Sequence, residues 1–93
     1  DMKNWSEQLR EAKSDRIAGL AREYNEVLRK HERLVSYIDN TDIPFEDRIK
    51  HKDEHARLYD RLSALLIEIL DTGYVWTDEE VVRGFNIQKH NAA

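Results

Sequence analysis

Apolar side chains recur at alternating spacings of three and four residues along the first part of the chain. This seam comprises Ile17, Leu20, Tyr24, Val27, His31, Leu34 and Ile38. Such spacing places its members on one side of an α-helix, as in helices that pack against each other. A further apolar residue follows every second seam position and widens the apolar arc; the residues concerned are Ala21, Leu28 and Val35. The pattern predicts a helix over about residues 6–39, with Asn4 or Ser6 as its N-terminal cap.

Residues 39–44 separate this helix from a second apolar repeat. The segment concentrates turn-forming residues, and its last member, Pro44, suits the first turn of a helix. The second seam comprises Ile49, His51, His55, Leu58, Leu62, Leu65 and Ile69, with Tyr59 and Leu66 beside it. It predicts one continuous helix over about residues 44–71, which ends where Gly73 can adopt a left-handed conformation.

A capping box follows this second helix, formed by Thr77 and Glu80. It predicts a short third helix over about residues 78–83, ended by Gly84. Residues 88–93 are expected to form a frayed tail. The chain of 93 residues contains only three Gly and one Pro and has no linker between its elements. We therefore expect a single all-α domain over its whole length.

The short connection predicts that the two long helices lie antiparallel, with residues at equal distance from the turn opposite each other. Tyr24 should then lie near Tyr59. Each helix presents more apolar surface than one neighbour can cover. We expect the C-terminal residues to cover only the end of the hairpin that lies away from the turn, in a local core with Trp5 and Leu9.

The middle of the hairpin and its turn end remain uncovered in this prediction. The candidate interaction residues are therefore Leu28, Val35, Tyr37, Phe45 and Tyr59. A homodimer of two hairpins, forming a four-helix bundle, would cover them. A different protein would do so equally well, and the sequence does not distinguish the two.

Composition narrows the classes of function. The chain contains no Cys, which excludes disulfides, thiolate metal sites and Cys nucleophiles. No apolar run approaches the roughly 20 residues of a membrane span, and we expect a cytoplasmic protein without membrane association. The serines have no His and Asp companions in a recognisable arrangement, and no Gly-rich phosphate loop is present. We expect no catalytic residues, no cofactor and no small-molecule substrate.

Three histidines are the strongest candidates for chemistry. His51 and His55 are four residues apart on one helical face, and the antiparallel register places His31 between them. Three imidazoles could ligate zinc, with Glu54 or Asp47 as a fourth ligand, or could charge below neutral pH and loosen the bundle. They also suit a structural role, as hydrogen-bonded seam residues that specify register. Because His-x-x-x-His spacing is common by chance, we assign no metal site from it.

Charge bears on binding to nucleic acid. The formal net charge is −4, which disfavours non-specific binding to phosphates. The outer side of the first helix can nevertheless present a basic stripe, formed by Arg22, Arg29, Lys30 and Arg33. Interleaved acidic residues weaken this stripe; they are Glu23, Glu26 and Glu32.

Three functional hypotheses follow from these features. The leading one is a non-enzymatic protein-interaction module, a small regulator, inhibitor or assembly factor that acts as a helical-hairpin dimer. The alternative is a nucleic-acid-associated regulator that uses the basic stripe. The third is a metal- or pH-responsive bundle based on the histidines.

Overall fold

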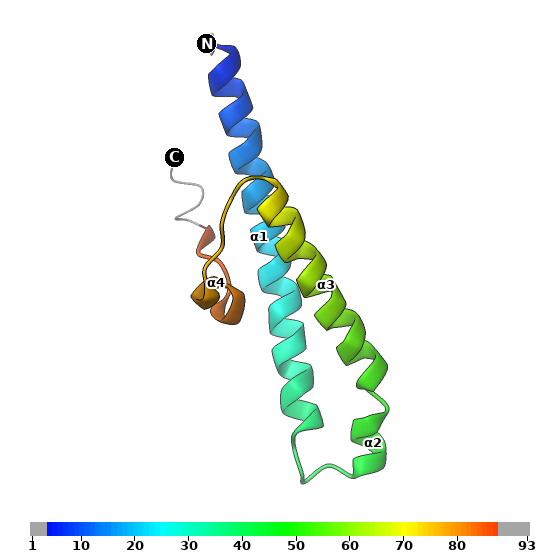
Figure 1. The fold of residues 1–93 in the computed structure, drawn as a ribbon. Coiled ribbons are helices and arrows are strands. Elements are labelled where there is room, and N and C mark those ends of the chain that lie inside the picture. Colours follow the sequence, from blue (N-terminus) through cyan, green and yellow to red (C-terminus); the bar gives the residue numbers. More distant parts are fainter. Residues whose placement is uncertain (1–3, 88–93) are drawn as a thin grey trace.

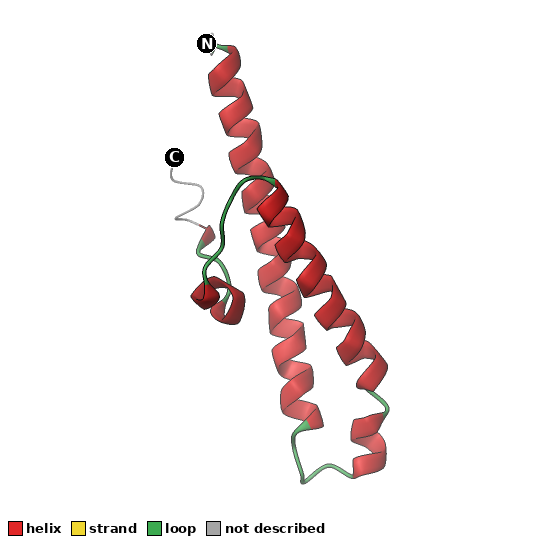
Figure 2. Cartoon of the chain, viewed as in Figure 1, coloured by secondary structure: helices red, strands yellow, loops and turns green. Residues whose placement is uncertain are grey.

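The chain folds as a long antiparallel helical hairpin to which a short C-terminal helix is attached (Figure 1). The computed structural model describes residues 4–87, and the predicted tail at 88–93 lies outside this range. Within residues 4–87 the elements are helices connected by loops, without strands (Figure 2). Their bounds are α1 Trp5–Ile38, α2 Phe45–Ile49, α3 Lys52–Asp71 and α4 Asp78–Arg83. The all-α class is confirmed, in an elongated molecule of 61 × 23 × 20 Å.

Helices α1 and α4 begin where the sequence places their caps. The Asn4 side chain accepts a hydrogen bond of 2.9 Å from the backbone N–H of Glu7. At the start of α4, Thr77 and Glu80 form a reciprocal capping box. Each cap satisfies backbone N–H groups that the first turn of a helix leaves without partners. The predicted bounds of both helices are correct to within one residue.

The prediction of one continuous helix over 44–71 is wrong, because the chain bends between α2 and α3. His51 has φ −96° and ψ 6°, outside the helical range. The bend accompanies two hydrogen bonds of 2.9 Å from the Arg48 guanidinium, one to the carbonyl of Ile43 and one to that of Ile38. The last turn of α1 has no basic residue of its own. Arg48 therefore supplies, from the next element, the cation that a helix C-terminus favours.

The bend also changes the register near the turn. Glu23 meets Arg61 in an ion pair, within one residue of the register that equal distance from the turn predicts. Nearer the turn, however, Tyr37 contacts the ring of His51 rather than Glu46. Tyr24 lies in the core and is 1% exposed, whereas Tyr59 is 60% exposed on α3.

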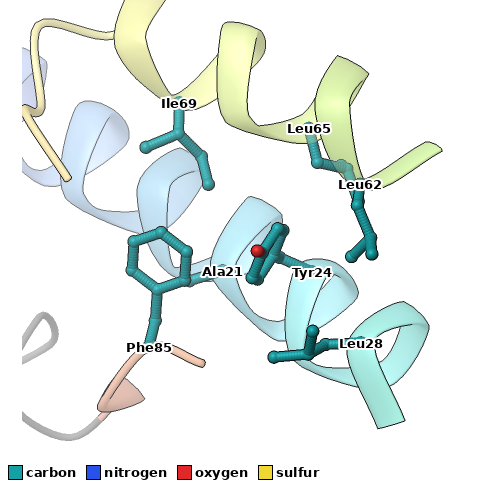
Figure 3. Close-up of a cluster of buried hydrophobic side chains, with 7 residues drawn as sticks. All are labelled: Ala21, Tyr24, Leu28, Leu62, Leu65, Ile69 and Phe85. Atoms are coloured by element: carbon teal, nitrogen blue, oxygen red, sulfur yellow. The ribbon is translucent and has the colours of Figure 1, made fainter. Parts of the chain in front are cut away.

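The core lies in the part of the hairpin that the C-terminal segment covers (Figure 3). Its buried members are Ala21, Tyr24, Leu28, Leu62, Leu65, Ile69 and Phe85. Phe85 reaches in from the C-terminal segment and meets the Tyr24 ring edge-on, with 5.3 Å between centroids. The Tyr24 hydroxyl donates a hydrogen bond of 2.5 Å to the carbonyl of Val81. Burial also raises the pKa of Tyr24 above its ordinary value.

The C-terminal segment packs Tyr74 and Trp76, together with Leu66, against the core, but it lies nearer the middle of the hairpin than predicted. We expected a local core with Trp5 and Leu9, but Trp5 is 73% exposed and Leu9 is also exposed. After Gly73, which has φ +94°, the chain turns back toward the middle of α1. The Trp76 indole N–H fixes this path by donating to the carbonyl of Leu66 at 3.0 Å.

Candidate functional site

The half of the hairpin nearest the turn has no buried side chain between residues 29 and 61. We call this stretch the turn half. The buried residues of the described chain lie at 18–28, at 62–72 and at Phe85. In the turn half, α1 and α3 are joined by partly exposed rings and polar groups rather than by a closed core. The turn half exposes Phe45, Ile49 and Tyr59, so it offers a partner apolar surface that its own core does not cover.

His31 and His55 stack across the seam of the turn half, with ring centroids 4.7 Å apart. The Nε2 atom of His31 is buried and has no hydrogen-bond partner among the described residues. Burial lowers the pKa of His31, because it penalises the charged imidazolium, and His55 lowers it further by charge repulsion. Glu32 acts in the opposite direction. The environment of His31 therefore favours its neutral imidazole.

His51 lies apart from this pair. Its ring packs against Tyr37 with 4.9 Å between centroids, and its Nδ1 atom is 3.5 Å from the Glu54 carboxylate. The three predicted histidines thus do not converge on one point. Among residues 4–87 there is no group of three or more His, Asp or Glu side chains placed to hold a metal ion.

An open groove of about 420 Å³ runs along the turn half. It is lined by Lys30, Arg33, Leu34, Tyr37, His51 and Glu54. Leu34 and Tyr37 are half-buried, whereas Lys30, Arg33 and Glu54 are exposed. The groove thus combines apolar surface with cations from α1 and a carboxylate from α3.

The candidate interaction residues do not form a single surface. Leu28 is only 8% exposed, and Gly84 of the C-terminal segment lies against it, so Leu28 is a core residue. Val35 and Tyr37 are half-buried, and of the five only Tyr37 lines the groove. Tyr59 is exposed on α3. Phe45 is exposed on α2, with the Arg48 guanidinium 5.7 Å from its ring centroid.

The basic stripe is present as an exposed surface of α1. Its members Arg22, Arg29, Lys30 and Arg33 are all exposed. Arg29 donates a hydrogen bond of 3.0 Å to the carbonyl of Asn25, and exposed Glu26 lies among the cations. The stripe is therefore mixed in charge, and its two members nearest the turn also line the groove.

Sequence reasoning missed two residues that shape this part of the molecule. Arg48 fixes the bend that brings His51 beside Tyr37. Asn25 binds the backbone of Phe85 and so sets where the C-terminal cover ends. The available signal for Asn25 was a weak helix former next to the apolar seam in the middle of a long helix. For Arg48 the pattern contained no signal, since its partners are backbone carbonyls.

The chain matches no model of a known protein family, and comparison with curated proteins and with solved structures finds no significant match either. No helix in the described part of the chain is long and apolar enough to cross a bilayer.

Proposed function

We propose that this chain is a non-enzymatic protein-interaction module, a small regulator, inhibitor or assembly factor that works as a dimer of helical hairpins. The groove of the turn half is its binding site for another protein. The observation that supports this most directly is the absence of any buried side chain between residues 29 and 61 of the described chain, beside an open groove with half-buried Leu34 and Tyr37. A hairpin whose turn half lacks a closed core is suited to receive a partner there.

The groove defines the chemistry of the segment it would bind. Leu34 and Tyr37 offer apolar and aromatic surface, and Tyr is among the residues that most often dominate binding energy at interfaces. Lys30 and Arg33 stand on the same side of the groove, and an Arg guanidinium binds carboxylates in a bidentate fashion. The proposed ligand is therefore a protein segment with an apolar anchor residue flanked by Asp or Glu.

The openness of the groove favours binding over catalysis. Catalytic groups act most effectively where bulk water is excluded, because electrostatic interactions are then stronger. In this groove the titratable pair is His51 and Glu54, and both side chains are substantially exposed. Contact with a macromolecule requires no such exclusion before binding.

The proposal is tested by capturing partners from the native host on the immobilised chain and identifying them by mass spectrometry. The decisive variants are Arg33→Glu and Tyr37→Ala, both in the groove. Arg22→Glu is the matched control, because it makes the same charge change at an exposed position of α1 outside the groove. A protein retained by the wild type and by Arg22→Glu, but lost with both groove variants, is the expected result.

Two results would contradict this assignment. Capture that is insensitive to Arg33→Glu and Tyr37→Ala would show that the groove is not the binding site. Capture of nucleic acid, lost equally with Arg22→Glu and Arg33→Glu and steeply dependent on salt, would instead favour the basic stripe as a nucleic-acid site.

A further inference from the structure

One side of α3 carries exposed apolar and small residues that the hairpin does not use. We call this set the α3 stripe; it comprises Ala56, Tyr59, Ser63, Ile67 and Leu70. Spacings of three and four residues place these positions on one helical face. Ser63 is half-buried and the other four members are exposed. The stripe is a second apolar face beside the one that buries Leu62, Leu65 and Ile69.

Further exposed apolar residues lie at the two ends of the molecule. Helix α1 runs past the end of α3, because Lys13 is already level with Gly73, its Nζ atom lying 3.1 Å from where a Cβ at Gly73 would be. Residues 5–12 thus form an overhang without a neighbouring helix (Figure 1), and it exposes Trp5 and Leu9. At the opposite end, α2 exposes Phe45 and Ile49.

These residues are arranged symmetrically along the long axis about the level of Ser63. Tyr59 and Ile67 lie four residues to either side, about 6 Å at the helical rise. Ala56 and Leu70 lie seven residues to either side, about 10 Å away.

The same symmetry extends to the two ends. The Glu23–Arg61 ion pair shows which residues of α1 and α3 lie at the same level, and it places Ser63 level with Ala21. Measured from this level at the helical rise, the overhang residues Leu9 and Trp5 lie about 18 and 24 Å away along the axis. On the other side, Ile49 and Phe45 lie fourteen and eighteen residues before Ser63 along the chain, about 21 and 27 Å away at the same rise.

We propose that the α3 stripe binds a second copy of this chain, antiparallel to the first, with a two-fold axis that crosses α3 at Ser63. Tyr59 packs on Ile67 of the second copy, and Ala56 packs beside Leu70 of the second copy. The overhang of each copy lies level with α2 of the other. This inference rests on the dimer included in the proposed function and specifies its interface, which is separate from the groove.

A second copy is the occupant that this arrangement fits. A two-fold dimer uses the same patch on both subunits, so each residue of the patch must meet a counterpart at equal distance on the other side of the axis. A small residue at the centre of the stripe lets the two helices approach closely, and large residues on each side interlock. The stripe, overhang and α2 together span most of the 61 Å length of the molecule. Such a length suits an interface of about 800 Å² per partner, the usual size in stable complexes.

A disulfide tests the axis directly, because the chain contains no Cys. In Ser63→Cys the two introduced thiols lie on the axis, within reach of each other, since a disulfide joins Cα atoms about 4.4–6.8 Å apart. Oxidation should convert most of this variant to covalent dimer on a non-reducing gel. Ser36→Cys is the matched control: Ser36 is exposed on α1, and the two copies of Ser36 lie more than about 30 Å apart in this dimer, judged from the helical rise. It should remain monomeric on the gel.

Light scattering supplies the second measurement. The wild type should have twice the mass of one chain at high micromolar concentration, and Ile67→Lys should have the mass of one chain with unchanged helical circular dichroism. Val82→Lys is the control, since Val82 is 66% exposed against 60% for Ile67 but lies on α4, and it should remain dimeric. A monomeric wild type overturns the dimer itself. A dimer that persists in Ile67→Lys, or that fails to cross-link through Ser63→Cys, overturns this interface only. Neither outcome bears on the groove, which the capture experiment tests separately.

Discussion

Asn25 and Phe85, sixty residues apart in the chain, are joined by two hydrogen bonds between a side chain and a backbone. The Asn25 amide donates from Nδ2 to the Phe85 carbonyl at 2.9 Å and accepts at Oδ1 from the Phe85 N–H at 2.7 Å. The carboxamide thus replaces the backbone partner that a strand would have supplied. Because it satisfies both polar groups of a residue whose ring is buried, this pair fixes where the C-terminal segment crosses α1.

Asn25→Ala should therefore loosen the whole C-terminal cover. The substitution removes both hydrogen bonds that Asn25 makes to the Phe85 backbone, at an expected loss of about 1–3 kcal/mol in the free energy of unfolding. Urea unfolding followed by circular dichroism measures this loss. Glu26→Ala, at the neighbouring exposed position, is the control and should change stability by less than about 0.5 kcal/mol. Equal stability of the two variants would show that the Asn25 contact is dispensable.

Two glycines should respond to Ala substitution with opposite signs. Gly84 has φ +99°, and a Cβ there would lie 2.7 Å from Oδ1 of Asn25. Gly84→Ala should lower the free energy of unfolding by at least about 1 kcal/mol, because the conformation is strained for an L side chain and the Asn25 contact is displaced. Gly19 lies within α1 with nothing within 4 Å of its Cβ position. Gly19→Ala should stabilise by about 0.5–1 kcal/mol through helix propensity. Thermal unfolding of both variants provides the comparison, and a shift of the same sign in both would contradict the argument.

Local signals predicted those elements whose partners lie nearby in the sequence. The Asn4 cap and the Thr77–Glu80 capping box fixed the starts of α1 and α4 correctly, because each involves contacts within one helical turn. The bend after α2 and the path of the C-terminal segment depend instead on Arg48 and Asn25, which bind backbone atoms. Apolar periodicity contains no information about such partners.

The candidate site was predictable only in part, for the same reason. Tyr37 was identified from its apolar character in a region expected to be uncovered, and it does line the groove. His51 also lines the groove, but its contact with Tyr37 was not predicted, because equal distance from the turn placed Glu46 opposite Tyr37. Leu28 was selected as an interaction residue because the C-terminal segment was expected at the other end of the hairpin; the structure buries it beneath Gly84.

Arg48 should control the order of the turn. Arg48→Ala removes both hydrogen bonds to the carbonyls of Ile38 and Ile43. Because the donor is charged, we expect the free energy of unfolding to fall by about 1–3 kcal/mol. Hydrogen exchange should accelerate most at residues 39–51 and less in the core around Leu65, where it follows global unfolding. Arg57→Ala, at an exposed position of α3, is the control. Unchanged exchange near the turn in Arg48→Ala would mean that α2 is held in place by other contacts.

The His31–His55 stack predicts a pH dependence with a definite sign. Burial and the neighbouring His55 lower the pKa of His31 in the folded chain, while in the unfolded chain it keeps its ordinary value of about 6.5. As the pH falls through about 6.5, the unfolded state therefore binds more protons than the folded state. The contribution of His31 to stability is thus fully present above this pH. It is lost as the pH falls to the lower pKa that His31 has in the folded chain. Glu32 on α1 opposes this effect but does not reverse its direction.

Only histidines among the side chains ordinarily titrate between about pH 5 and 8. The midpoint of thermal unfolding should therefore decrease as the pH is lowered through this range. His31→Gln should flatten this dependence, because it replaces the imidazole by a neutral group of comparable size. His51→Gln is the control and should leave it in place, since the His51 ring packs against Tyr37 and does not belong to the stack. If the slope is the same in the wild type and in His31→Gln, the turn half does not respond to protonation of this pair, and the acid sensitivity of the chain arises elsewhere.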